Sequence, residues 1–263
     1  FLGDGATDGG VEGGNATMTD QVMRETYLPP YAAAVDKGIA SIMVGFNSYN
    51  GINLHQHTHL VTDVLKGELG FKGVVVSDWN GGIRFGEPHT VINAGVDIAM
   101  QPGNHDEFMS KLKASVLDKT VPMSRIDDAV NRILAMKFKL GLFSDPFGKE
   151  EFATSIGSDK HRAIARQAVR ESLVLLKNEN AALPLLATES IAVVGKHGNN
   201  SGLQSGGWSI QWQGQAENYR GATTIFDGMN AIGSNVEYAE QGCYPGMAAD
   251  KAVVVVGENP YAE

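Results

Sequence analysis

Short apolar runs that suit buried strands alternate with amphipathic helical patterns over the first 143 residues of this chain. The clearest run is 73–77, Gly-Val-Val-Val-Ser, in which three successive β-branched residues indicate a strand covered on both faces. The helix predicted before it has its apolar residues at helical spacing: Leu60, Val61, Val64, Leu65 and Leu69. This alternation predicts a parallel sheet, with segments of the length expected in a barrel of parallel strands.

Further elements continue the pattern. Segment 38–51 is predicted to be a strand that runs into a polar loop, and 94–100 a second strand. Helices are predicted at 19–37 (interrupted at Pro29 and Pro30), 108–117 and 124–143. In the last helix we expect Ser124 and Asp127 to cap the start and Gly141 to end it. Only about three or four barrel strands can be counted over 1–143, so we expect a half-barrel with open sheet edges.

The composition changes after residue 143. Residues 144–160 are polar and rich in turn formers, which is typical of a linker. A helix at 161–171 follows, and "SIAVVG" and "KAVVVVG" indicate buried strands further on. We therefore predict a second α/β domain over 161–263, the first part of a sandwich with a partly parallel sheet.

Asp78 and Trp79 come directly after the valine strand. In parallel α/β folds the carboxyl ends of the strands carry the active site. A carboxylate there can be a nucleophile, a metal ligand or a helix N-cap. The neighbouring indole favours a sugar site, because a sugar ring needs a flat apolar face and an anion near its anomeric carbon.

The net charge of −9 disfavours nucleic acid and anionic membranes as partners, since both need a basic surface. The apolar runs are too short to span a bilayer. Cys243 is the single cysteine, so an internal disulfide is excluded. The composition is compatible with a neutral substrate such as a sugar.

Two tryptophans, Trp208 and Trp212, lie among glycines and glutamines in "SGGWSIQWQG". We expect them to be exposed, as in a carbohydrate cleft, rather than in a core. Glu258 and Glu263 follow the last valine strand, and from the residues alone either is a candidate general acid or a solvated loop charge.

The glycine-rich segment 1–14 carries Asp4, Asp8 and Glu12. It has neither the lysine-serine pair of a P-loop nor the Gly-x-Gly-x-x-Gly spacing after a strand, so it fits a substrate-binding loop better than a phosphate-binding loop. The segment 55–59, "HQHTH", suggests a metal site, but alternate residues point apart where a helix begins, and no carboxylate cluster accompanies them. We expect surface histidines or hydroxyl contacts there and no metal. Met100 suits packing, as lone methionines do, yet we include it among the candidate substrate-binding residues because it follows a strand.

Taken together, these segments resemble the family 3 glycoside hydrolases, close to their β-glucosidase and exo-β-glucan glucohydrolase branch. The resemblance covers nearly the whole chain. Its most specific strings are "HLVTDVLKGELGFKGVVVSDW" and "PMSRIDDAVNRILAMKFKLGLF", and "FLGDG", "GFNSYNG", "GGWSIQWQG" and "GENPYAE" follow the family order. It implies that residues 1–143 are the C-terminal half of a (β/α)₈ barrel, followed by an α/β sandwich, and it implies a β-glucoside substrate and no cofactor.

The resemblance also implies roles for particular residues. Asp78 is the catalytic nucleophile, and Glu263 of the Pro-Tyr-x-Glu stretch is the acid/base, which leaves Glu258 as a supporting residue. Asp4 binds sugar hydroxyls in the −1 subsite. The aromatic walls of the pocket are expected to be Trp79, Trp208 and Trp212, with Trp212 at the +1 subsite.

The N-acetylglucosaminidase branch takes its acid/base from an Asp-His pair in a loop that here reads "GDGATDGGVEGGN", without histidine. The Lys-His pair that the family places before Phe1 and the first half of the barrel are absent from the sequence. We therefore expect a fragment whose main partner is the missing remainder of its own polypeptide. A periplasmic or secreted location is favoured over a cytoplasmic one, which stays open. The alternative functions are an inactive carbohydrate-binding homologue and another β-glycosidase of the family, a β-xylosidase or an N-acetylglucosaminidase.

Overall fold

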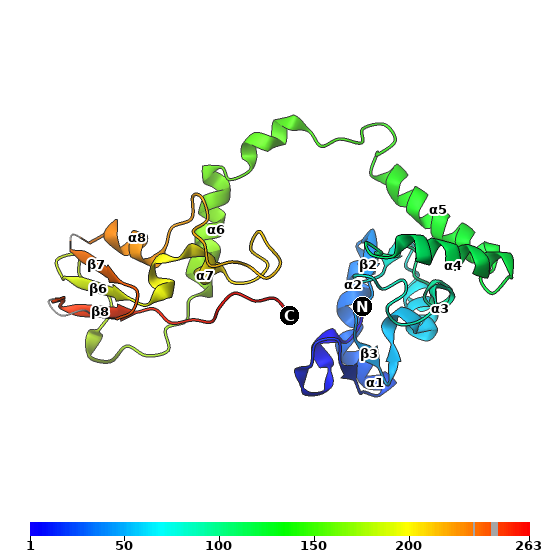
Figure 1. Cartoon of the computed structure of the whole chain (residues 1–263), viewed down its shortest axis with the longest axis horizontal. Coiled ribbons are helices and arrows are strands. Elements are labelled where there is room, and N and C mark those ends of the chain that lie inside the picture. Colours follow the sequence, from blue (N-terminus) through cyan, green and yellow to red (C-terminus); the bar gives the residue numbers. More distant parts are fainter. Residues whose placement is uncertain (234, 243–246) are drawn as a thin grey trace. The chain divides into compact units, whose positions relative to one another are not determined.

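The computed structural model describes residues 1–233, 235–242 and 247–263 (Figure 1). The single cysteine, Cys243, lies outside the described residues. The chain divides into two compact units, Phe1–Thr154 (unit 1) and Ser155–Glu263 (unit 2). The domain ranges predicted from the sequence, 1–143 and 161–263 with a linker at 144–160, stay predictions, and each unit is described by itself.

The central pair of strands in unit 1 is parallel. β2 (Ser41–Met43) lies beside β5 (Val74–Val76), with Ser41 opposite Val74 and Met43 opposite Val76. The π-helix η5 (His59–Glu68) buries Leu60, Val61, Val64 and Leu65, as its apolar spacing predicted. Strand and helix are therefore joined through one apolar core, and the carboxyl ends of β2 and β5 lie at one edge.

The strand predicted at 94–100 is wrong for most of its length. Ala94 ends helix α3 (Pro88–Ala94), and Ile98 forms only a single parallel bridge with Val76. A side chain interrupts the ladder: Asp97 Oδ2 accepts the Val75 N–H at 2.8 Å, in the place of a strand carbonyl. The sheet of β2 and β5 thus has two paired strands and one bridge rather than three full strands.

The remaining elements of unit 1 surround this pair. A small sheet has the order β1 (Asn15–Ala16), β3 (Ser48–Tyr49), β4 (Ile52–Asn53), in which β3 is parallel to β1 and antiparallel to β4. The other helices and helical turns are η1 (Asp4–Ala6), η2 (Asp8–Gly10), α1 (Asp20–Val22), η3 (Met23–Tyr27), α2 (Pro29–Asp36), η4 (Leu54–Gln56), α4 (His105–Leu117), α5 (Met123–Lys139) and, reaching the unit boundary, η6 (Glu150–Ser155).

Helix α5 begins one residue before the predicted cap. Pro122 precedes it with extended backbone, and its carbonyl accepts the Arg125 N–H at 2.9 Å, so Ser124 lies inside the first turn. The fixed φ of proline suits this position, which is why the Ser124 and Asp127 cap was wrong. The prediction that Gly141 ends this helix is confirmed. Gly141 has φ 72°, and the Leu142 N–H donates to the Lys137 carbonyl at 3.1 Å.

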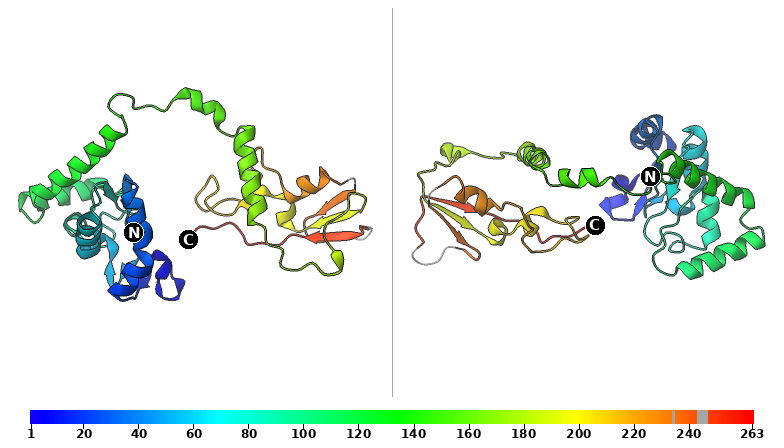
Figure 2. Two further views of the ribbon diagram at one scale, coloured as in Figure 1. Left: turned by 180° about the vertical axis from the view of Figure 1, so that it is seen from behind. Right: turned by 90° about the horizontal axis from the view of Figure 1, so that it is seen from above.

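Unit 2 is built on a parallel sheet with the order β7 (Val236–Ala239), β6 (Ile191–Val194), β8 (Lys251–Val254). All four residues of the central strand β6 are buried. Helix α8 (Ile225–Asn230) lies against β7 (Figure 2). The other helical elements are α6 (Asp159–Ser172), η7 (Glu179–Ala181), η8 (Lys196–Asn199) and α7 (Ser201–Ser205).

Both units are α/β in build, as the sequence predicted. In the part of the chain that the structure describes, no helix combines the length and apolar character needed to cross a membrane.

Candidate active site

Asp78 lies just beyond the carboxyl end of β5, and its backbone is held from both sides. Its N–H donates to Nε2 of His55 at 3.0 Å. Its carbonyl accepts from the Gly81 N–H at 2.9 Å and from the Ser77 hydroxyl at 2.8 Å. The strand therefore ends in a turn whose first residue cannot rotate freely.

The carboxylate of Asp78 is less constrained than its backbone. Oδ1 accepts the Trp79 N–H at 2.7 Å, the only hydrogen bond to this carboxylate within the described residues. The residue itself is half-buried. A carboxylate with a fixed backbone and an open oxygen can act as a nucleophile, a role that a fully paired carboxylate cannot take.

Three further candidates lie at the same end of the strands. Trp79 follows Asp78 and is 57% exposed. The Met100 N–H donates to the Ser77 hydroxyl at 2.7 Å. Asp4 follows Phe1, whose amino group donates to the carbonyl of Met43, the last residue of β2. Burial lowers the pKa of that amino group to about 6, and the charges of Asp4 and Asp78 oppose the shift, which places both carboxylates near it. The structure thus places Asp78, Trp79 and Met100 at the carboxyl end of β5, with Asp4 and Asp78 both within electrostatic range of the Phe1 amino group.

The three histidines of "HQHTH" have three different environments, and two are not at the surface. His55 is fully buried, and His57 is buried against the edge of the Tyr49 ring. His57 Nδ1 accepts the Leu60 N–H at 3.2 Å, in the first turn of η5. His59 is exposed and lies 3.2 Å from Asp63. The expected surface histidines are therefore wrong for His55 and His57. Over 1–233, 235–242 and 247–263 the structure holds no group of three or more side chains suited to bind a metal.

In unit 2 the two predicted tryptophans are exposed, Trp208 by 71% and Trp212 by 55%, as expected. Their rings are 6.5 Å apart at 67°, and the Trp208 N–H donates to the Trp212 carbonyl at 2.8 Å. Trp208 has φ 59°, a left-handed backbone that is uncommon for a bulky residue. The loop is thus a tight turn that turns both indoles toward solvent.

A second loop, 257–263, carries Glu263 and is attached to the tryptophan loop by one side chain. Gln213 accepts the Ala262 N–H at 3.0 Å and donates to the Ala262 carbonyl at 3.2 Å. The buried His197 contacts the Glu258 carbonyl through Nε2 at 2.8 Å. Glu258 itself hydrogen-bonds the Tyr261 hydroxyl, and this bond raises the pKa of the phenol. Glu263 is exposed beside the loop of Trp208 and Trp212.

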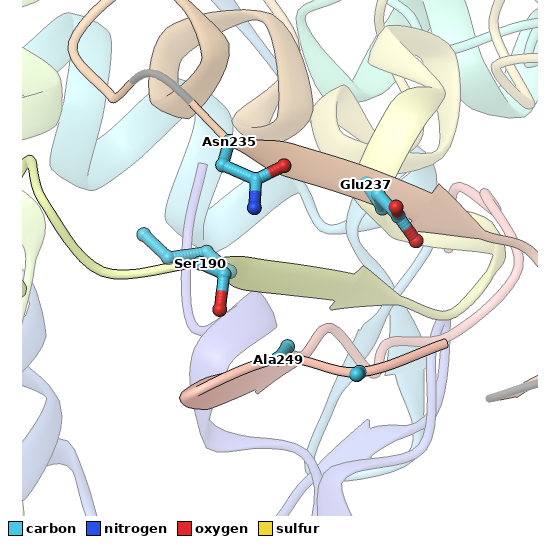
Figure 3. Close-up of a pocket in the computed structure, with 6 residues that line it drawn as sticks. Ser190, Asn235, Glu237 and Ala249 are labelled. Carbon is cyan, nitrogen blue, oxygen red and sulfur yellow. The ribbon is translucent and has the colours of Figure 1, made fainter. Parts of the chain in front are cut away.

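A shallow hollow of unit 2 lies at the opposite edge of its sheet, where the strands begin (Figure 3). Ser190 and Asn235, which precede β6 and β7, line it together with Ala249. Glu263 instead follows the carboxyl end of β8. The hollow therefore takes no part in the candidate site.

Sequence reasoning missed His55, His197 and Gln213. The histidine pattern alone gave no sign of burial, and Gln213 was one glutamine among several. The sequence offers one signal for Gln213, which is its place between Trp212 and Gly214. In the structure, a Cβ added at Gly214 would come within 2.8 Å of Pro260. Close approach of the two loops requires a glycine there.

Comparison with known proteins decides the relationship. The sequence profile described as the glycosyl hydrolase family 3 N terminal domain matches residues 1–136, and that of the family 3 C-terminal domain matches residues 173–263. The chain belongs to glycosyl hydrolase family 3. The family resemblance inferred from the motifs is thereby confirmed.

Individual relatives of the family agree. The chain is 37% identical to a periplasmic beta-glucosidase of Salmonella typhimurium, over 80% of this chain and 29% of the relative. It is 34% identical to a beta-xylosidase of Formosa agariphila, over 80% of this chain and 32% of the relative. A crystal structure of an exo-1,3/1,4-beta-glucanase from a Pseudoalteromonas species superposes with a TM-score of 0.93 at 40% identity, covering 100% of this chain and 35% of that one. The chain thus spans about a third of the length of these family 3 relatives.

Proposed function

We propose that the protein is a retaining, exo-acting β-glucosidase that removes terminal β-D-glucosyl residues, and that this chain supplies both catalytic carboxylates. The observation that carries the proposal is Asp78, which has a fixed backbone, an open carboxylate oxygen and an exposed indole beside it at the end of β5. In this reading, unit 1 is the C-terminal part of a (β/α)₈ barrel and unit 2 the first part of an α/β sandwich. Active sites of such barrels lie at the carboxyl ends of the strands.

In the first step the Asp78 carboxylate attacks the anomeric carbon. The bond from that carbon to the leaving oxygen breaks, and Glu263 gives its proton to this oxygen. The products are the free alcohol and a glucosyl ester on Asp78.

In the second step the ionised Glu263 takes a proton from water, whose oxygen attacks the same carbon. The ester bond breaks, Asp78 regains its charge, and glucose leaves with its β configuration retained. This mechanism requires the two carboxyl groups to be about 5–5.5 Å apart when substrate is bound.

The proposal also gives roles to the other aromatic and acidic candidates of each unit. Trp79 provides a stacking face beside the nucleophile, and Trp212 with Trp208 provides one for the +1 sugar, because exposed indoles bind the apolar faces of sugar rings. Asp4 accepts hydrogen bonds from hydroxyl groups of the −1 sugar, and Met100 contributes apolar wall. No step in this scheme requires a metal or a cofactor.

The nucleophile is tested by Asp78→Ala in the full-length protein. Hydrolysis of an aryl β-glucoside should fall by roughly 10⁴-fold or more, because the covalent path is lost. Azide should restore part of the rate and yield the α-glucosyl azide. Near-normal hydrolysis without azide would exclude Asp78 as the nucleophile, and absence of activity in the unaltered protein would favour an inactive carbohydrate-binding homologue.

The acid/base is tested by Glu263→Ala. Glucosides with good leaving groups need no proton, so their first step should stay fast, whereas substrates with poor leaving groups should lose on the order of 10²–10⁴-fold. Equal losses for both classes would count against Glu263. The matched control is Glu258→Ala, which should show no dependence on the leaving group.

A second candidate activity, β-xylosidase, is favoured by the relative from Formosa agariphila. Xylosides lack the exocyclic hydroxymethyl group of glucosides, so contacts to that group separate the two specificities. An apolar contact to its carbon discriminates by about 10–200-fold, and a hydrogen bond to its hydroxyl discriminates more strongly. Comparing kcat/KM for matched aryl β-glucoside and β-xyloside decides between them.

A further inference from the structure

His55 has the burial and bonding of a side chain fixed in one state. It has 0% exposure, and its ring stacks on Phe85 with centroids 5.0 Å apart and an angle of 27°. Phe46 lies in a second stacked contact, at 6.2 Å and 26°. The imidazole is therefore enclosed by protein and packed against two aromatic rings.

The hydrogen bonds of His55 settle which nitrogen carries the proton. Nε2 faces the backbone N–H of Asp78 at 3.0 Å, and an N–H can only donate, so Nε2 is an acceptor without a proton. Nδ1 faces the Asn53 side-chain oxygen at 3.1 Å, which is an acceptor, so Nδ1 carries the proton. Both contacts are satisfied by the neutral Nδ1–H tautomer and by no other state of the ring.

The charge state agrees with this tautomer. Burial lowers the pKa of His55 to about 4, and the charges of the Phe1 amino group and of the Arg84 guanidinium add smaller effects in the same direction. The imidazole is therefore neutral near neutral pH. A protonated ring would turn Nε2 into a donor and break the bond to Asp78.

The turn after Asp78 is built around the same ring. A Cβ at Gly81 would come within 2.7 Å of His55 Cδ2 and 2.9 Å of the Asp78 carbonyl, so only glycine permits this approach. The glycine N–H in turn donates to that carbonyl at 2.9 Å. The imidazole thus contacts the Asp78 peptide on one side and the returning chain on the other.

We propose that His55 is a positioning residue for the nucleophile: its neutral Nδ1–H tautomer, oriented by Asn53, fixes the Asp78 peptide and thereby aims the carboxylate. This inference rests on the proposed role of Asp78. It assigns one histidine of "HQHTH" to catalysis through hydrogen bonding rather than through a metal. The direction of the Cα–Cβ bond of Asp78 is set by the two peptide planes that flank it, one held by His55 and the other by Ser77 and Gly81. A displacement of about 1 Å at a reacting group can cost about 10²-fold in rate.

A purely structural role predicts a different pattern of variants. If His55 only fills space, His55→Leu should serve as well as any polar substitute. If acceptance at the Nε2 position matters, His55→Gln should preserve function, because its side-chain oxygen reaches the place of Nε2. His55→Asn should not, because its oxygen reaches only the place of Nδ1.

The experiment measures covalent trapping of the full-length protein by a 2-deoxy-2-fluoro-β-glucoside with a good leaving group. The trapping rate reports attack by Asp78 and does not depend on the acid. We expect His55→Leu and His55→Asn to be slowed about 10- to 100-fold and His55→Gln to remain within about threefold of the unaltered protein. The matched control is His57→Leu, which should lower stability without slowing the trapping of folded protein.

Trapping of His55→Leu at the unaltered rate, or slowing of His55→Gln as large as that of His55→Leu, would overturn the proposal. If the leucine variant does not fold, the glutamine and asparagine variants still decide it. Nitrogen-15 NMR of the unaltered protein gives an independent test, since a proton on Nε2 would contradict the tautomer. If the unaltered protein is not trapped at all, the proposed function fails, while the NMR result still tests the state of His55.

Discussion

Asp78 and Asp97 lie next to the same strand, β5, and have opposite surroundings. Asp78 follows the carboxyl end, and its carboxylate accepts one hydrogen bond among the described residues. The Asp97 side chain is 0% exposed and contacts two cations, Lys66 at 2.8 Å and the Arg125 guanidinium. It also accepts the Val75 N–H.

The difference teaches how one strand serves two purposes. Around Asp97 every charge has a partner, and Arg132 extends the network to the Phe71 and Gly73 carbonyls at 2.8 and 3.0 Å. Such a site holds helices to the strand and leaves no oxygen for chemistry. Around Asp78 only the backbone is fixed. Under the proposed function, stability and catalysis would lie at the two ends of one strand, as in barrel enzymes.

The largest expected effect is on stability, from Asp97→Ala. Removing this carboxylate leaves Lys66 and Arg125 buried without their main partner and leaves the Val75 N–H unpaired. We expect a loss of about 3–5 kcal/mol in the free energy of unfolding, measured by urea denaturation. Protein that remains folded should keep its kcat/KM within a few-fold.

The matched variant is Asp78→Ala, which should change the free energy of unfolding by less than about 1 kcal/mol, since its carboxylate is half-buried and accepts one bond. If Asp97→Ala is harmless, or Asp78→Ala is the more destabilising of the two, the contrast between the two aspartates fails.

A second prediction concerns pH. The pKa of His55 is lowered by burial from its ordinary value of 6.5 to about 4, so between these values the unfolded chain binds a proton that the folded one does not. The free energy of unfolding should therefore fall as pH drops through this window, by up to about 3 kcal/mol. Burial also lowers the pKa of His57, which adds an effect of the same sign.

Urea midpoints at about pH 7 and about pH 4.5 measure this slope, and His55→Gln should reduce it. Asp128, in the charge network around Asp97, does not share this window. Burial raises the pKa of Asp128, but Arg132 and Lys66 outweigh it, so this group loses its contribution only below the ordinary aspartate range. An identical slope in the glutamine variant would mean that His55 is accessible to protons at mild pH.

A third prediction is that Gly81→Ala damages the turn at Asp78. The added methyl group overlaps His55, whose ring is fully buried and stacks on Phe85. We expect a loss of about 1–3 kcal/mol in stability and a lower kcat. Gly70→Ala is not a suitable control because its φ is 66°, whereas Gly5 has an ordinary φ and open space around it, so Gly5→Ala should be tolerated.

The smallest expected effect comes from unit 2. Gln213→Ala removes both hydrogen bonds to the Ala262 backbone and so loosens Glu263. We expect about a tenfold loss in kcat/KM for glucosides with poor leaving groups, and little change for good ones. Gln215→Ala is the control, because Gln215 is bonded only to Glu217 in the same loop, among the described residues. Equal losses in kcat/KM for both variants would show that Gln213 does not act through Glu263.

How much of this could be predicted depended on how local the cause was. Asp78 was predictable, because a valine strand that ends in an acid places that acid at the edge of a parallel sheet. The exposure of Trp208 and Trp212 was also predictable from their glycine- and glutamine-rich surroundings. Both features depend on residues adjacent in the sequence.

The rest depends on partners distant in the sequence. Asp97 interrupts the strand predicted at 94–100 because its carboxylate accepts the N–H of Val75, 22 residues away in the sequence. His55 is buried because Phe85, 30 positions further on, covers it, and the "HQHTH" pattern looks the same whether its histidines are buried or exposed. The Ser124 cap failed for a local reason that was overlooked, since Pro122 already sets the start of α5.

The central claim is that Asp78 forms the covalent bond to the sugar. It is tested most directly by treating the full-length protein with a 2-deoxy-2-fluoro-β-glucoside, digesting it and locating the label by tandem mass spectrometry. We predict one fluoroglucosyl group, attached to Asp78 in the peptide that contains "VVVSDW". A label on any other carboxylate, or release of α-glucose as the first product of hydrolysis, would contradict the account.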